Sequence, residues 1–70
     1  MIVSKFSHTK LKQLRKQAGL SRRQLADACA VARTTVAEYE QGRYSPSAAV
    51  LAAAATALRC SVADFFEEVA

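Results

Sequence analysis

The sequence contains few residues that could bind a metal or support catalysis. Its 70 residues include two cysteines, Cys29 and Cys60, whose separation fits no metal-ligand spacing, and one histidine, His8, remote from both in the sequence. No Ser-His-Asp or Cys-His arrangement, glycine-rich phosphate loop or plausible pair of carboxylates can be identified. We therefore expect a protein that is not an enzyme, with no catalytic residue, metal or cofactor.

Long apolar runs are also missing. The longest, residues 48–58, is about half of the ~20 residues that a membrane-spanning helix needs. The apolar start Met1-Ile2-Val3 is too short for a signal peptide. These absences predict a cytoplasmic protein without a membrane segment. In that reducing compartment the cysteines are best read as small buried side chains, with a disulfide or redox switch as the alternative.

The charge is unevenly distributed along the chain. The sequence has ten Lys and Arg against six Asp and Glu, a net charge of +4. Basic residues fill the first part of the chain and precede the first acid, Asp27, whereas Asp64, Glu67 and Glu68 gather near the end. This distribution predicts a dipolar protein that approaches a polyanion in one orientation. The alternative is that these charges simply belong to ordinary solvated helix faces.

The length and the helix signals predict one all-α domain of five helices, residues 1–70. Residues 1–5 show no helical period and are predicted to form an N-terminal arm. Serine caps open most of the predicted helices, at Ser7, Ser21, Ser47 and Ser61, with capping-box partners Gln24 and Asp64. A domain of this size buries only about 60% of its unfolded surface and leaves no room for a small-molecule effector domain, so a partner subunit would add stability.

Residues 20–42 read as two short helices joined by a tight apolar turn. In the second helix Val36, Tyr39 and Glu40 share one face at helical spacing. The opposite face carries four other side chains: Arg33, Thr34, Ala37 and Glu38. Arg, Thr and Glu can address the edges of DNA bases.

This stretch resembles the helix-turn-helix domains of the phage-repressor family, the Cro/C1-type or Xre-like proteins. The motif positions are Leu20, Ser21, Leu25, Ala26, Cys29, Val31, Val36, Tyr39, Glu40, Gly42 and Pro46, and the resemblance extends over about residues 6–66. Two positions depart from the pattern. Ala30 replaces the usual turn glycine, and Ala32 replaces the usual Ser or Thr cap of the recognition helix.

The resemblance implies a compact five-helix domain with the helix-turn-helix at about residues 21–41. It also implies a sequence-specific transcriptional regulator, a repressor or small controller protein, that binds a pseudo-palindromic double-stranded DNA operator as a homodimer. The base-reading residues would be Arg33, Thr34, Ala37 and Glu38. The backbone contacts would come from Ser21, Arg22, Arg23, Thr35, Gln41, Arg43 and Tyr44. For Arg22, and for the loop residues Gln41, Arg43 and Tyr44, the alternative is an exposed side chain with no partner.

Two further expectations concern packing. The resemblance places Arg15 against Glu40 as a buried ion pair. Two adjacent phenylalanines cannot both face one small core, which makes Phe66 and Val69, with Ala49 and Ala53, candidate dimer contacts or simply isolated exposed apolar residues.

One alternative function remains from the sequence. An antitoxin or adaptor with the same fold would bind a protein instead of DNA. The polar residues Arg33, Thr34 and Glu38 favour DNA, because a pure interaction module has no reason to keep them polar.

Overall fold

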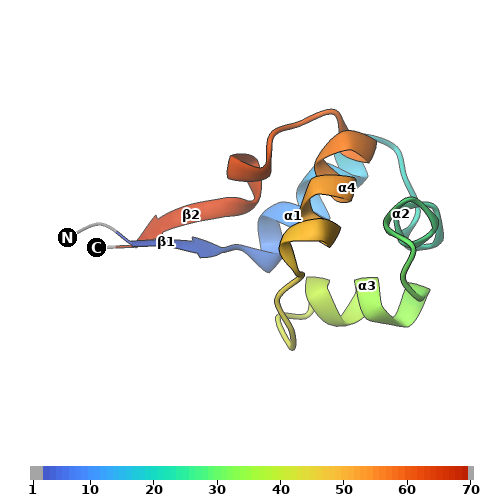
Figure 1. Cartoon of the computed structure of the whole chain (residues 1–70), viewed down its shortest axis with the longest axis horizontal. Helices are drawn as coiled ribbons and strands as arrows, with labels where there is room; N and C mark the ends of the chain where they lie inside the picture. Colours follow the sequence, from blue (N-terminus) through green and yellow to red (C-terminus); the bar gives the residue numbers. More distant parts are fainter. Residues whose placement is uncertain (1–2, 70) are drawn as a thin grey trace.

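The computed structural model describes residues 3–69, and in this range it is mostly helical. The elements in chain order are β1 (Val3–Phe6), α1 (His8–Gln17), α2 (Arg22–Cys29), α3 (Arg33–Glu40), α4 (Ala48–Leu58), the 3-10 helix η1 (Val62–Phe65) and β2 (Phe66–Val69). Figure 1 shows the helices gathered into one body, with β1 and β2 leaving it together at one end. Within residues 3–69, every helix is too short or too polar to span a bilayer.

Serine side chains start three of the helices at the predicted positions. The Ser7 hydroxyl accepts from the Lys10 N–H at 3.3 Å, and the Ser47 hydroxyl accepts from the Val50 N–H at 3.3 Å. At α2 the capping box is complete, since the Gln24 side chain also accepts from the Ser21 N–H at 2.8 Å. Each cap satisfies helix N–H groups that would otherwise lack an intrahelical partner.

The turn between α2 and α3 contains the two positions that depart from the family pattern. Ala30 adopts the left-handed conformation (φ 56°, ψ 40°) that glycine would reach without cost. Ala32 precedes α3 with no side-chain hydrogen bond to the helix start. Of the two conformations open to Ala30, the positive φ or a shifted turn, the structure shows the positive φ.

The core lies between the helices. Phe65, Leu25 and Val36 are the largest fully buried side chains, and they belong to η1, α2 and α3. Leu11 of α1 and the inner face of α4 complete the cluster.

The predicted fifth α-helix and N-terminal arm are corrected by the structure. Residues 62–65 form one 3-10 turn, and the chain then continues as β2, which pairs antiparallel with β1. Phe6 lies opposite Phe66, with their rings edge to face at 6.3 Å, and Lys5 lies opposite Glu67. The Ser7 N–H donates to the Phe65 carbonyl at 2.8 Å, so the contact between the two chain segments continues up to the start of α1. Met1 and Ile2 of the predicted arm lie outside the described residues.

Candidate nucleic-acid interface

The outer face of α3 is most open at the N-terminal end of the helix. Arg33 and Thr34 are exposed, whereas Ala37 and Glu38, also predicted to read bases, are half-buried. Thr35, predicted to contact the DNA backbone, is half-buried as well. The Arg43 N–H donates to the Glu38 carbonyl at 3.0 Å, so the following loop folds back onto the end of the helix. The first turn of α3 is therefore the most accessible part.

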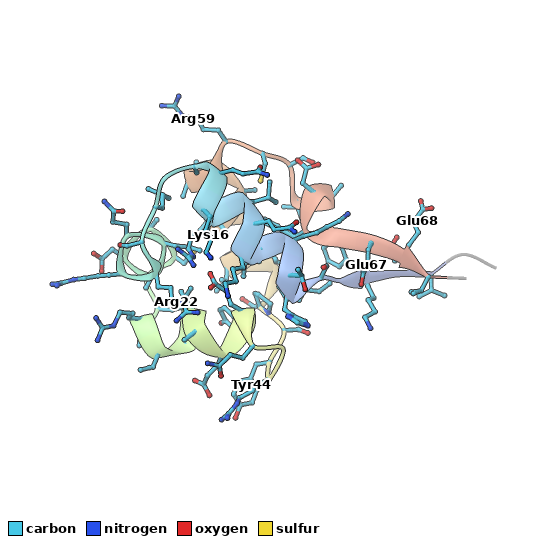
Figure 2. All side chains as sticks on the ribbon, turned by 180° about the vertical axis from the view of Figure 1, so that it is seen from behind. Lys16, Arg22, Tyr44, Arg59, Glu67 and Glu68 are labelled. Atoms are coloured by element: carbon cyan, nitrogen blue, oxygen red, sulfur yellow. The ribbon has the colours of Figure 1, made fainter. Side chains whose placement is uncertain are left out.

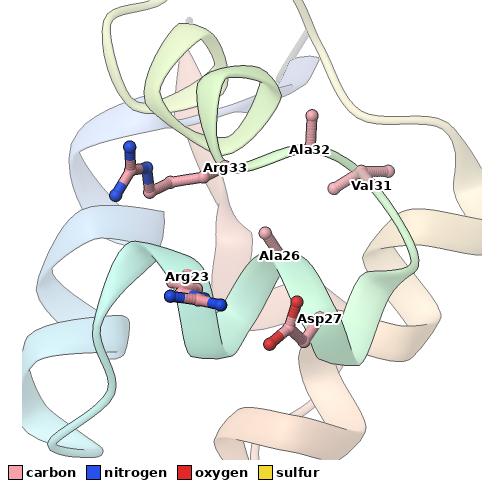
Figure 3. Close-up of a pocket in the computed structure, with 6 residues that line it drawn as sticks. All are labelled: Arg23, Ala26, Asp27, Val31, Ala32 and Arg33. Atoms are coloured by element: carbon pink, nitrogen blue, oxygen red, sulfur yellow. The ribbon is translucent and has the colours of Figure 1, made fainter.

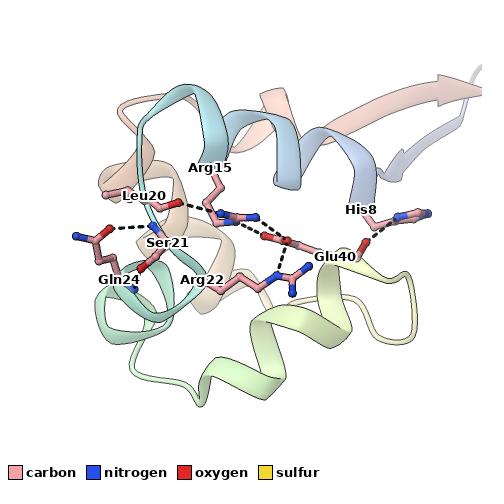
Figure 4. A network of polar contacts seen from close by, with 7 residues as sticks. All are labelled: His8, Arg15, Leu20, Ser21, Arg22, Gln24 and Glu40. Carbon is pink, nitrogen blue, oxygen red and sulfur yellow. Dashed lines mark hydrogen bonds and ion pairs between the residues drawn. The ribbon is translucent and has the colours of Figure 1, made fainter.

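The inner face of α3 is fixed by the side chain of Glu40. Its carboxylate accepts from Arg15 Nε at 2.6 Å and from Arg15 Nη2 at 3.2 Å. Arg22 Nε donates to the same carboxylate at 3.1 Å. The Glu40 side chain is 0% exposed, and Arg15 also donates to the Leu20 carbonyl at 2.9 Å (Figure 4). One carboxylate therefore connects α1, α2 and α3.

The pKa of Glu40 reflects this environment. Burial by itself would raise the pKa, because it disfavours the charged carboxylate. The hydrogen bonds from Arg15 and Arg22 and the charges of these two residues outweigh burial and hold the pKa of Glu40 below its ordinary value. The carboxylate is consequently ionised at neutral pH, as three hydrogen bonds from guanidinium groups require.

The sequence left two interpretations of Arg22: a contact to the DNA backbone, or an exposed side chain with no partner. It has an ion-pair partner, so it is not an unpaired surface arginine. Its side chain remains 39% exposed, which leaves part of the guanidinium at the surface near the start of α2 (Figures 2 and 4). The interaction with Glu40 was not predicted. Eighteen residues separate the pair in the sequence, and no helix periodicity relates them.

An open hollow lies beside the first turn of α3. It has a volume of about 310 Å³. Its lining is Arg23, Ala26, Asp27, Val31, Ala32 and Arg33. Figure 3 shows Arg23 and Asp27 on α2 and Arg33 at the start of α3, so two cationic side chains border the turn between the helices.

The remaining predicted contacts to the DNA backbone surround α3. Gln41, Arg43 and Tyr44 in the following loop are exposed, Tyr44 to 61%. Ser21 is exposed too, although its hydroxyl oxygen already accepts from the Gln24 N–H at 3.1 Å. Figure 2 shows Arg22 and Tyr44 near α3, while Glu67 and Glu68 lie on β2 at the far end of the molecule. Arg22 thus lies on the α3 side of the molecule, and two acidic side chains lie at the opposite end.

His8, for which no role was predicted from the sequence, also lies in this region. Its Nδ1 lies 3.2 Å from the Glu40 carbonyl oxygen, and its ring lies against Gly42. The contact joins the start of α1 to the end of α3 across 32 residues. From the sequence, the only indication that these two segments meet was the ion pair between Arg15 and Glu40 that the family resemblance implies.

The four candidate dimer residues have different environments. Ala49 is exposed on α4 and Ala53 is half-buried there. Phe66 is half-buried and already in edge-to-face contact with Phe6, whereas Val69 is 42% exposed. Among the described residues, no three His, Cys, Asp or Glu side chains lie close enough together to hold a metal ion.

Solved structures similar to this chain include several bacterial regulators. The clp gene regulator ClgR from Corynebacterium glutamicum is 36% identical, with a TM-score of 0.78 over 83% of this chain and 62% of that chain. The chain thus spans less than two thirds of that ClgR chain. The restriction-modification controller protein C.AhdI from Aeromonas hydrophila is 30% identical, with a TM-score of 0.78 over 84% of this chain and 89% of that one.

A third similar structure comes from a protein complex. A chain of the complex between the SinR and SinI proteins is 30% identical, with a TM-score of 0.72 over 79% of this chain and 54% of that chain. A comparison with curated protein sequences finds no match. The HTH_3 family model, described as helix-turn-helix, matches residues 11–65. This match contains α2, α3 and the turn between them. The chain therefore belongs to the HTH_3 helix-turn-helix family.

Proposed function

We propose that this protein is a sequence-specific DNA-binding transcriptional regulator that inserts α3 into the major groove. The observation that carries this proposal is the contrast between the two faces of α3. Arg33 and Thr34 are exposed, while Glu40 on the inner face is held by arginines of α1 and α2. A recognition helix needs this combination, because base contacts discriminate only when the helix is held rigidly. The regulators ClgR and C.AhdI support the same function by similarity.

The side chains divide into base-reading and backbone-holding groups. Arg33 can donate two bonds to guanine O6 and N7, Thr34 can bond an acceptor or touch a thymine methyl, and Glu38 can accept from cytosine N4. Ala37 offers an apolar contact beside them. The backbone group comprises Ser21, Arg22, Arg23, Thr35, Gln41, Arg43 and Tyr44. The cationic members neutralise phosphates in any sequence, so they supply affinity rather than discrimination.

Binding as a homodimer to a pseudo-palindromic operator is part of the proposal. One recognition helix reads too few base pairs to specify a genomic site, and two-fold pairing doubles the number read. We also propose a cytoplasmic location, because a transcriptional regulator needs access to chromosomal DNA. Complex formation between SinR and SinI makes a protein partner the second candidate, tested by the same experiment.

The test compares three arginine variants on two duplexes. Genomic DNA retained by the protein is sequenced to find the cognate site, and a scrambled duplex of equal length serves as the non-cognate probe. Arg33→Ala should lose about 1–3 kcal/mol on the cognate duplex and much less on the scrambled one. Arg43→Ala should weaken binding to both duplexes equally and reduce the slope of log K against log salt by about 1.

Arg59→Ala is the matched control. Arg59 is exposed and lies on the opposite side of the molecule from α3, so its loss removes the same charge without touching the interface (Figure 2). Equal losses on both duplexes would remove Arg33 from the base-reading group. Failure to retain any DNA would reject the proposed function and favour a protein partner.

A further inference from the structure

His8 connects the start of α1 to the loop that follows α3. Its Nδ1 lies 3.2 Å from the Glu40 carbonyl oxygen (Figure 4). A Cβ atom added at Gly42 would lie 3.0 Å from His8 Cδ2 and 3.2 Å from His8 Nε2. The imidazole therefore rests on the glycine backbone, with Nε2 beside the loop. His8 as a residue is nevertheless exposed, so a ligand at the loop can reach its side chain.

The Glu40 carbonyl determines which ring nitrogen carries the proton. A carbonyl oxygen only accepts hydrogen bonds, so Nδ1 must be the protonated nitrogen when this contact forms. In the neutral ring Nε2 is then a bare acceptor, which repels a phosphate oxygen. A second proton turns Nε2 into a cationic donor and leaves the bond from Nδ1 to Glu40 intact. Protonation can thus change the surface of the loop without disturbing the fold.

We propose that His8 is an additional DNA-backbone contact that takes up a proton on binding. Its imidazolium Nε2–H donates to a phosphate held at the loop of residues 41–44. This inference rests on the proposed function, because it concerns the same DNA and the same loop. Its consequence is that the affinity for DNA rises as the pH falls through the range in which histidine titrates.

The charged groups nearest to His8 on α1 and in the loop are basic, apart from Glu40. The ring stands in the first turn of α1. Lys12 follows one turn later on α1, and Arg43 follows Gly42 in the loop. The Glu40 carboxylate is engaged by its two arginine partners. A bound phosphate would therefore supply the negative charge that stabilises the imidazolium.

Few other groups titrate in the same pH range. His8 is the one histidine of the chain. Burial raises the pKa of Cys29, and burial together with the charge of Asp64 raises the pKa of Cys60. The pKa of Glu40 is lowered by its arginine partners despite burial. Between about pH 5.5 and 7.5, a change in affinity for DNA can therefore be traced to His8 by substitution.

Two substitutions distinguish the effect of protonating His8 from the effect of its packing against the loop. His8→Asn places an amide nitrogen near the position of Nδ1, which preserves donation to the Glu40 carbonyl and removes Nε2. His8→Gln places an amide near the position of Nε2, which gives a neutral donor that cannot take up a proton. Melting temperatures of both variants establish that the fold is retained before binding is measured.

The probe is a short duplex of random sequence, since phosphate contacts are independent of base sequence. Fluorescence anisotropy should show the wild-type protein binding about five- to tenfold more tightly at about pH 5.5 than at pH 7.5. Calorimetry in buffers of different ionisation enthalpy should show proton uptake by the wild type. Both variants should show affinities that hardly change with pH, and neither should take up the proton.

Three results would overturn the inference in distinguishable ways. A wild-type affinity that is constant over this pH range would reject the proton-linked contact while leaving DNA binding intact. Retention of the pH dependence by His8→Asn would assign the proton to another group. Absence of DNA binding at every pH would reject this inference and the proposed function together.

Discussion

Glu40 is the residue on which the polar contacts between α1, α2 and α3 converge. A carboxylate buried to this degree is tolerated because two arginines replace the hydrogen bonds that water would make. Removing the carboxylate would leave Arg15, which is also buried, without its partner. The stability of the recognition helix should therefore depend on this one side chain.

We expect Glu40→Ala to lower the free energy of unfolding by about 3–5 kcal/mol, the usual cost of breaking a buried ion pair. Urea denaturation followed by circular dichroism measures the loss. Glu67→Ala is the control, because Glu67 is exposed on β2 and should change stability little. A Glu40→Ala protein that unfolds at the wild-type urea concentration would contradict this account.

The lowered pKa of Glu40 also predicts how stability depends on pH. A carboxyl with a lower pKa in the folded state than in the unfolded state stabilises the fold above the unfolded pKa. This stabilisation is lost as the pH falls from about 4.5 through the lower folded pKa. Acid titration of the unfolding free energy should show a steeper loss for the wild type than for Glu40→Gln. Parallel acid titrations for the two proteins would rule out Glu40 as the source.

At this scale the sequence predicted some contacts and missed others. Arg15 and Glu40 were paired because both occupy family positions, and the structure places their side chains in contact. Two contacts were not predicted: the hydrogen bond from Arg22 to the same carboxylate, and the contact of His8 with the Glu40 carbonyl. Neither follows from periodicity, because each depends on how separate helices pack.

The turn between α2 and α3 is the element whose sequence fits its conformation least well. Ala30 holds a positive φ, and Ala32 leaves the start of α3 without a side-chain cap. Ala30→Gly should raise the free energy of unfolding by about 1 kcal/mol, and Ala32→Ser by about 0.5–1 kcal/mol. Chemical denaturation of each variant measures the gain.

Ala28→Gly is the control for the turn variants. Ala28 is exposed inside α2, where glycine should cost about 1 kcal/mol. A gain at position 30 with a loss at position 28 would assign the effect to backbone conformation. Losses at both positions would show that Ala30 is not strained in solution.

The helices were largely predictable as elements, and the strands were not. Serine caps, the capping box at Ser21 and the apolar stripes are local signals that propensity and hydrogen bonding create. The strands have four residues each and stand at opposite ends of the described chain, so no short-range pattern relates them. Their pairing, with Phe6 against Phe66, depends on how the helices between them pack.

Considered as a whole, the molecule carries two acidic side chains at the end that is remote from α3. Glu67 and Glu68 on β2 lie far from Arg22 and Tyr44 near α3 (Figure 2). This arrangement favours approach to DNA with α3 leading, because the acidic end is repelled by phosphates. Replacing Glu67 and Glu68 by Gln should therefore raise the association rate on random DNA at low salt, with a smaller effect at high salt. Stopped-flow measurements at two salt concentrations provide the test.

The proposed homodimer makes a separate prediction at the same scale. Two α3 helices related by a two-fold axis should protect half-sites whose centres lie ~34 Å apart. Footprinting on the cognate site should show both halves protected together, with binding that rises more steeply than the first power of protein concentration. Protection of a single half-site with linear binding would reject the homodimer.

The pairing of β1 with β2 also bears on how the native structure opens. These strands join the two ends of the described chain, so their contacts form only after the longest loop has closed. Each strand is short and mostly exposed, and little apolar surface holds the tip of the pair. Amide hydrogen exchange should consequently be fastest in residues 3–5 and 67–69 and slowest in the core helices. The β1–β2 pair would then open as a separate unit of low stability, while the helices that present α3 to DNA stay folded.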